Sequence, residues 1–107
     1  MTSWGNLFVA GVLEVTWAIG LKYADGWTKF WPSVFTIAGM VASFYFLARA
    51  IVTIPVGTAY AVWTGIGAVG TAMFGVILFG EHLTLARVAC LLLIVTGIIG
   101  LRMTSSH

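Results

Sequence analysis

Glu14 is the clearest candidate for chemistry in this chain, because it lies in the middle of an apolar run, Trp4–Leu21, that is otherwise uncharged. An ionisable side chain costs at least ~2.5–3.5 kcal/mol at the centre of a membrane-spanning helix, and such a residue is a functional-site candidate by default. The other acidic residues, Asp25 and Glu81, lie in polar breaks between apolar runs. A carboxyl group in lipid can hold a proton or bind a cation, so we expect exchange chemistry.

The residues around Glu14 on the same helix face are small, apart from one tryptophan. Helical spacing places Ala10, Gly11, Trp17 and Ala18 on this face, which leaves room beside the carboxyl group. Two simpler interpretations remain open. Glu14 could be protonated and only hydrogen-bond a neighbouring helix, and Trp17 could be a packing aromatic.

Two further apolar runs contain groups that could serve the same carboxyl group. Tyr60 and Trp63 follow one stripe of the third run together with Gly67. A Tyr O–H or Trp N–H needs a hydrogen-bond partner when it is buried, and a carboxylate in lipid needs donors. Ser43 in the second run is either a further polar group of the site or a serine that bonds its own i−4 carbonyl.

The third run is also rich in glycine, at positions 65, 67 and 70. Helices kink at glycines, so Gly65 and Gly67 are candidates for a hinge that bends differently in two states. Small residues also permit close helix packing in a membrane. The two interpretations are compatible.

A buried carboxyl group suits exchange because desolvation disfavours its charged form. Two such groups near a dimer axis titrate as a coupled pair. The pair would hold protons or a cation but not both, and this mutual exclusion is what an antiporter requires. We find no nucleophile–base pair, phosphate loop or metal cluster in the sequence, so we expect no enzyme, no cofactor and no metal.

The composition indicates a membrane protein. The 107 residues are 61% hydrophobic and 7% charged, whereas soluble domains carry roughly 25% charged residues. Crossing a bilayer takes ~20 apolar residues, and in lipid such runs must be helical. We therefore predict an all-α integral membrane protein with one transmembrane domain over residues 1–107. Its four helices are expected at approximately Trp4–Leu21, Pro32–Ala48, Val56–Phe79 and Ala86–Leu101.

Other classes of function have little support in the sequence. A net charge of +2 is too small and too scattered to indicate nucleic-acid binding. The lone Cys90 excludes a disulfide within the chain and is interpreted as a small packing residue. The first apolar run has no preceding basic region and no cleavage site, so we expect the first helix to be retained.

The charges flanking the four spans do not specify one orientation. Lys22, Lys29 and Arg87 would lie on one side of the membrane, and Arg49 and Arg102 would lie on the other with the N-terminal amine. Orientation is normally set by a Lys/Arg excess on the cytoplasmic side. A chain without this bias could insert both ways up, so we predict an antiparallel, dual-topology homodimer in which the last helix forms the dimer contact.

Three motifs resemble a known family over essentially the whole chain. They are the Glu in the first of four short helices, Trp31-Pro32-Ser33 at the start of the second, and Ala59-Tyr60-Ala61-Val62-Trp63-Thr64-Gly65-Ile66-Gly67 in the third. This pattern resembles the small multidrug resistance family. The segment Leu13-Glu14-Val15-Thr16-Trp17-Ala18-Ile19-Gly20-Leu21-Lys22-Tyr23 is similar to the guanidinium-exporter subtype. In the polyaromatic-cation exporters of the family, the position of Trp17 is typically glycine.

The resemblance implies proton-coupled export of guanidinium and small mono-substituted guanidinium ions across the bacterial plasma (inner) membrane. It implies an antiparallel homodimer with one Glu14 from each subunit in a shared site for guanidinium or protons. By position, Trp17, Ser43, Tyr60 and Trp63 match residues that order and hydrogen-bond the central Glu in the family. The departures lie outside the site: Thr16 replaces a usual valine, and residues 81–83 form a loop that the family does not keep fixed.

Three other functions remain open at this point. The nearest is a quaternary ammonium or multidrug cation exporter of the same family, which would tolerate glycine in place of Trp17. A non-transporting membrane subunit would keep every phenotype when Glu14 is replaced by glutamine. A channel would conduct ions without proton coupling.

Overall fold

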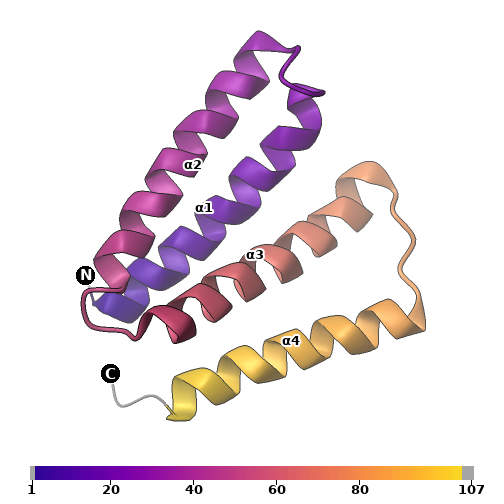
Figure 1. Ribbon diagram of the computed structural model, residues 1–107. Helices are drawn as coiled ribbons and strands as arrows, with labels where there is room; N and C mark the ends of the chain where they lie inside the picture. Colours follow the sequence, from indigo (N-terminus) through magenta and orange to yellow (C-terminus); the bar gives the residue numbers. More distant parts are fainter. Residues whose placement is uncertain (1, 105–107) are drawn as a thin grey trace.

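The computed structural model describes residues 2–104, and this part of the chain forms four long α-helices (Figure 1). All four are long and apolar enough to cross a membrane. This confirms the predicted all-α architecture with four candidate spans. The helices are α1 (Ser3–Ala24), α2 (Phe30–Ala50), α3 (Val56–Phe79) and α4 (Leu85–Thr104).

The ends of α1 follow local capping chemistry rather than the limits of its apolar run. α1 begins one residue before the apolar run, because the side chain of Thr2 accepts a hydrogen bond of 3.0 Å from the backbone N–H of Gly5. It continues three residues beyond Leu21 and stops at Asp25, whose φ of 50° is left-handed. α3 has the same bounds as its apolar run, between Pro55 and the left-handed Gly80.

α1 is the central helix of the fold, since it packs along both α2 and α3, whereas α4 packs mainly along α3 (Figure 1). The buried apolar core lies where the start of α1, the end of α2 and the start of α3 meet. Trp4, Leu7, Ile54, Val62 and Trp63 are its larger members. None of the described residues of α4 is buried. The chain therefore has a three-helix core, and α4 adds the partly buried Ile98 and Leu101 to its edge.

Glycines bring α1 close to its two neighbours. A Cβ atom on Gly11 would lie 2.7 Å from a methyl carbon of Ile66 in α3, and one on Gly39 in α2 would lie 3.0 Å from the Cβ atom of Trp17. The first distance is shorter than real Cβ atoms show and the second is at the tight end of what they show, so a side chain at either position would require the neighbouring residue to shift. This is the close packing by small residues that operates in membranes.

The glycines of α3 that were candidates for a hinge also lie in tight contacts. A Cβ on Gly65 would lie 2.8 Å from the side chain of Ile98 in α4, and one on Gly67 would overlap the Glu14 carboxyl group. α3 runs without a break through both positions. The close-packing interpretation is therefore confirmed, and the hinge stays a prediction.

Candidate functional site

Glu14 lies halfway along α1 and is half-buried against the backbone of α3. A Cβ on Gly67 would lie 2.8 Å from Cγ of Glu14, so only glycine leaves room for this side chain. The Oε1 atom of Glu14 is buried and has no hydrogen-bond partner among residues 2–104. The site thus presents one buried acceptor that the chain itself leaves unpaired.

Trp17 follows Glu14 by one helical turn and presents a second unpaired group. Its indole Nε1 is buried and has no hydrogen-bond partner within the described part of the chain. Buried polar groups without a partner are rare, because leaving one unpaired costs about 1–3 kcal/mol. An orphaned donor and an orphaned acceptor one turn apart indicate that a ligand or a second chain completes the site.

Ser43 and Trp63 form a closed hydrogen-bonded cluster with α1. The hydroxyl of Ser43, which is fully buried, donates to the carbonyl of Ala10 at 2.7 Å. It accepts a hydrogen bond of 3.0 Å from Nε1 of Trp63. The interpretation of Ser43 as a serine bonded to its own helix is therefore wrong. This serine joins α1, α2 and α3 one turn before Glu14.

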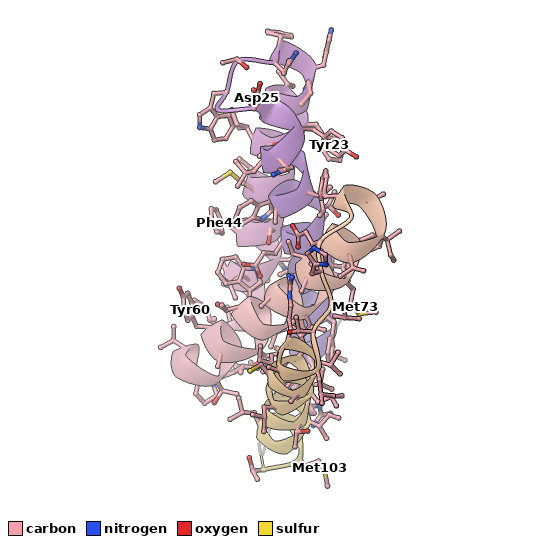
Figure 2. The ribbon with its side chains drawn as sticks, turned by 90° about the vertical axis from the view of Figure 1, so that its right-hand side faces the viewer. Tyr23, Asp25, Phe44, Tyr60, Met73 and Met103 are labelled. Carbon is pink, nitrogen blue, oxygen red and sulfur yellow. The ribbon has the colours of Figure 1, made fainter. Side chains whose placement is uncertain are left out.

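Tyr60 contacts this cluster only through its ring. The ring centroids of Tyr60 and Trp63 lie 5.7 Å apart, and Tyr60 is 59% exposed. Figure 2 shows Tyr60 from α3 and Phe44 from α2 on the same side of the molecule. Among the described residues, no hydrogen bond joins Glu14 to any of the four partners expected from the resemblance. The structure brings Ser43, Trp63 and Tyr60 together, whereas the two orphaned groups stay separate from them.

Phe44 connects the aromatic side chains and was not singled out from the sequence. Its ring centroid lies 6.5 Å from that of Trp17 and 5.6 Å from that of Trp63. Phe44 therefore links the tryptophan beside Glu14 to the closed cluster. In the sequence Phe44 is one of three consecutive aromatic residues after Ser43, and nothing in the sequence indicates which of them faces Trp17.

A groove of about 510 Å³ runs between α1 and α3 and contains the Glu14 carboxyl group. We call it the α1–α3 groove, and its polar lining consists of Glu14, Lys22, Thr64, Thr71, Glu81 and Arg87. Its remaining walls are mainly small, with alanines and two glycines. The groove thus leads from the middle of the membrane-spanning helices to the connection between α3 and α4.

The threonines of the groove differ from threonines elsewhere in the helices. Thr16, Thr36 and Thr96 each donate to the carbonyl four residues before them. Within the described residues, the hydroxyls of Thr64 and Thr71 make no such bond and are available to the groove. Their spacing from Gly67, three residues before and four after, could have identified them as sharing the face that meets Glu14.

Metal or thiol chemistry finds no support in this part of the chain. Within residues 2–104 no three His, Cys, Asp or Glu side chains are grouped as metal ligands. Cys90 is exposed on α4, so its interpretation as a packing residue does not hold within the single chain.

These features define a multi-pass membrane protein whose central polar group is one carboxyl side chain. The model of the family described as Small Multidrug Resistance protein matches residues 2–94, and the chain belongs to this family. The resemblance seen in the sequence is thereby confirmed. The family consists of transporters rather than enzymes, and the chain is a multi-pass protein of the bacterial inner membrane.

Similar curated proteins carry a more specific name. The chain is 55% identical over 103 residues to the guanidinium exporter of Proteus vulgaris, covering 96% of this chain and 99% of that protein. It is 57% identical over 103 residues to the guanidinium exporters of Citrobacter freundii and Salmonella typhimurium, covering 96% of this chain and 98% of each relative.

Proposed function

We propose that this protein is a proton-coupled antiporter that exports guanidinium and small mono-substituted guanidinium ions. The observation that carries the proposal is the Glu14 carboxyl group, a buried acceptor without a partner in the described chain, at the inner end of the α1–α3 groove. Identity of 55–57% to proteins named guanidinium exporters supports the choice of substrate.

The chemistry of guanidinium matches the groups around Glu14. The ion is planar and presents a fork of N–H donors that pairs with a carboxylate through two hydrogen bonds. It is weakly hydrated and stacks on aromatic faces. Trp17 follows Glu14 by one helical turn and its ring centroid lies 6.5 Å from that of Phe44, and an aromatic face contributes roughly 0.5–2 kcal/mol to a cation. A quaternary ammonium has no N–H and cannot form the fork.

Coupling follows from the competition of a proton and a cation for one carboxyl group. Proton loss from Glu14 creates the carboxylate that binds guanidinium, and rebinding of a proton releases the cation. Because either a proton or the cation neutralises the buried carboxylate, the loaded states are the ones that reorient. Exchange then needs no ionisable residue in the membrane-spanning helices other than Glu14 of each subunit.

Reorientation requires α3 to change its contacts, and Gly65 and Gly67 are the proposed hinge. Both lack side chains at their contacts with α4 and with Glu14. A bend at Gly67 would alter the surroundings of the carboxyl group directly. The hinge would thus couple occupancy of Glu14 to the position of α4.

The functional unit proposed is an antiparallel homodimer. Its support is the unpaired Glu14 and Trp17, the absence of buried residues among those described in α4, and the balanced charges at the two ends. Lys22 and Arg87 line the same groove, as expected if both lie on one side of the membrane. A second copy inserted in the opposite orientation would bring a second Glu14 and cover the exposed faces.

A quaternary ammonium exporter is the alternative, and the description of the family as multidrug resistance proteins favours it. Under this alternative the side chain of Trp17 would have no role in the substrate site. The proposal instead uses Trp17 to restrict the space next to Glu14, which excludes bulky cations.

The test is transport in proteoliposomes with guanidinium added outside and proton movement recorded. We expect proton efflux that depends on guanidinium and is absent in Glu14→Gln. Efflux driven by a tetra-alkylammonium but not by guanidinium would replace the proposal with the drug-exporter alternative. Guanidinium flux without proton movement would contradict antiport and favour a channel.

A further inference from the structure

The α1–α3 groove contains a second carboxyl group that is seated in the same way as Glu14. A Cβ on Gly75 would lie 2.8 Å from the carboxyl carbon of Glu81, just as a Cβ on Gly67 would overlap the carboxyl group of Glu14. Gly67 and Gly75 are eight residues apart on one face of α3. At about 1.5 Å of rise per residue, these two glycines, and the carboxyl groups packed on them, lie about 12 Å apart along the helix axis.

The inner carboxyl group, that of Glu14, and the outer one, that of Glu81, differ in their binding partners. Glu14 has an unpaired oxygen atom, whereas Oε1 of Glu81 lies 3.0 Å from Nη2 of Arg87. The side chains of Arg87 and Glu81 are 37% and 42% exposed. A half-exposed ion pair of this kind contributes little net stability and exchanges readily. The group that Glu81 holds is itself a guanidinium.

We propose that Glu81 is an outer binding site for guanidinium-type cations, occupied in the empty transporter by the guanidinium group of Arg87. The inference rests on the proposed function and deepens it. An arriving cation replaces Arg87 on Glu81 while Arg87 turns toward water, and no covalent bond changes. The cation then moves along the groove past Thr71, whose hydroxyl is available there, to Glu14. In an antiparallel dimer each face of the membrane would carry one such site.

Lys22 fits this assignment, because it is the other basic side chain of the groove and would otherwise repel an arriving cation. Its ammonium group lies 5.7 Å from the centre of the Phe79 ring, so part of its charge is directed to an aromatic face. Glu81 is then the one carboxylate at the outer end of the described groove that can attract the cation.

Two structural roles could account for the same ion pair. Arg87 also donates to the carbonyl of His82 at 3.0 Å, and its backbone N–H donates to Oγ1 of Thr84, so the pair could only hold the α3–α4 connection in place. Glu81 could also serve only to neutralise Arg87. These roles predict different behaviour when the two charges are removed singly and together.

The experiment measures KM and kcat for guanidinium-driven proton efflux at low ionic strength in wild type, E81Q, R87Q and E81Q/R87Q. We expect E81Q to raise KM by about twofold to fivefold, the upper part of the range of a half-exposed charge pair, while kcat stays close to that of wild type. R87Q should lower KM, because it removes the tethered competitor. The double variant should keep the raised KM of E81Q, since the carboxylate is absent from both.

The contradicting outcomes are distinct. A double variant with wild-type KM would show that Glu81 only neutralises Arg87. A fall in kcat at unchanged KM in both E81Q and R87Q would show that the Glu81–Arg87 ion pair only stabilises the α3–α4 connection. Unchanged kinetics in E81Q would remove Glu81 from the path. A wild type that moves no protons with guanidinium would overturn the proposed function, and this inference with it.

A matched control is Asp25→Asn, since Asp25 is an exposed acidic residue in the α1–α2 connection and does not line the groove. Asparagine also accepts the left-handed conformation found there. This variant should keep the wild-type KM. The effect of E81Q should shrink as salt is raised, because the screening length is only about 10 Å at ~0.1 M ionic strength.

Discussion

Two polar clusters lie one helical turn apart on α1 and are completed in opposite ways. In the first, the carbonyl of Ala10, the hydroxyl of Ser43 and the indole N–H of Trp63 satisfy one another. In the second, Glu14 and Trp17 each leave a buried polar atom unpaired. A closed cluster fixes the helices, whereas an open one needs something from outside the chain. We therefore propose a positioning role for the first cluster and substrate binding for the second.

The closed cluster and the open one are also mechanically connected. The ring of Phe44 packs against the rings of both Trp17 and Trp63. The position of the Trp17 ring in the open cluster therefore depends on Trp63 of the closed one. Gly67 sets the distance between Glu14 and α3. The geometry of the open cluster thus depends on residues that are not expected to touch the substrate.

The largest effect is expected from Glu14 itself. Glu14→Gln removes the exchangeable proton and the negative charge, so guanidinium-driven proton movement should fall to the level of vesicles without protein. Glu14→Asp keeps the carboxyl group on a shorter side chain and should retain reduced exchange that is still coupled. Equal loss in both variants would show that the position of the carboxyl group matters as much as its chemistry.

Gly67→Ala should have the second largest effect on transport, because the added methyl group would displace the Glu14 side chain. The new Cβ would overlap the Glu14 carboxyl group. A displacement of ~1 Å at a reacting group costs up to about 100-fold in rate, and overpacking costs ~1–3 kcal/mol in stability. Transport and thermal unfolding in detergent measure the two effects.

The matched control is Gly57→Ala on the same helix. A Cβ at this position meets nothing within 4 Å, so transport and stability should stay close to those of wild type. Similar losses in both variants would mean that glycine matters to α3 for its flexibility rather than for the fit against Glu14.

Trp17→Gly should alter selectivity more than rate. Removing the indole opens space beside Glu14, so a tetra-alkylammonium should become a substrate while guanidinium loses affinity. A shift of at least about tenfold in the ratio of the two kcat/KM values is expected for a pocket enlarged by a whole side chain. Competition transport assays measure it, and an unchanged ratio would remove Trp17 from the substrate site.

Ser43→Ala should have the smallest effect on coupling and a clear effect on stability. It leaves the Trp63 N–H unpaired in the protein interior and removes the added bond to the Ala10 carbonyl, at a cost of about 1–3 kcal/mol. Ser33→Ala is the control on the same helix, because Ser33 only bonds its own i−4 carbonyl. Loss of proton coupling in Ser43→Ala at unchanged thermal stability would contradict a positioning role.

The membrane-spanning pattern was accessible from the sequence because bilayer thickness and backbone pairing leave few alternatives. Glu14 was accessible in the same way, since a lone carboxyl group in a span is costly and is a functional-site candidate by default. Contacts between helices were not accessible, because they depend on how each helix is rotated. Examples are the hydrogen bond from Ser43 to Ala10 and the packing of the Glu14 and Glu81 carboxyl groups against glycines of α3.

The most direct test of the central claim is to count the protons released when guanidinium binds to the purified protein in weakly buffered solution. The account predicts that protons are released as the cation binds, that cation affinity falls as the pH is lowered, and that Glu14→Gln abolishes the release. Guanidinium binding with no proton release, or with release that persists in Glu14→Gln, would contradict the claim that proton and cation compete for Glu14.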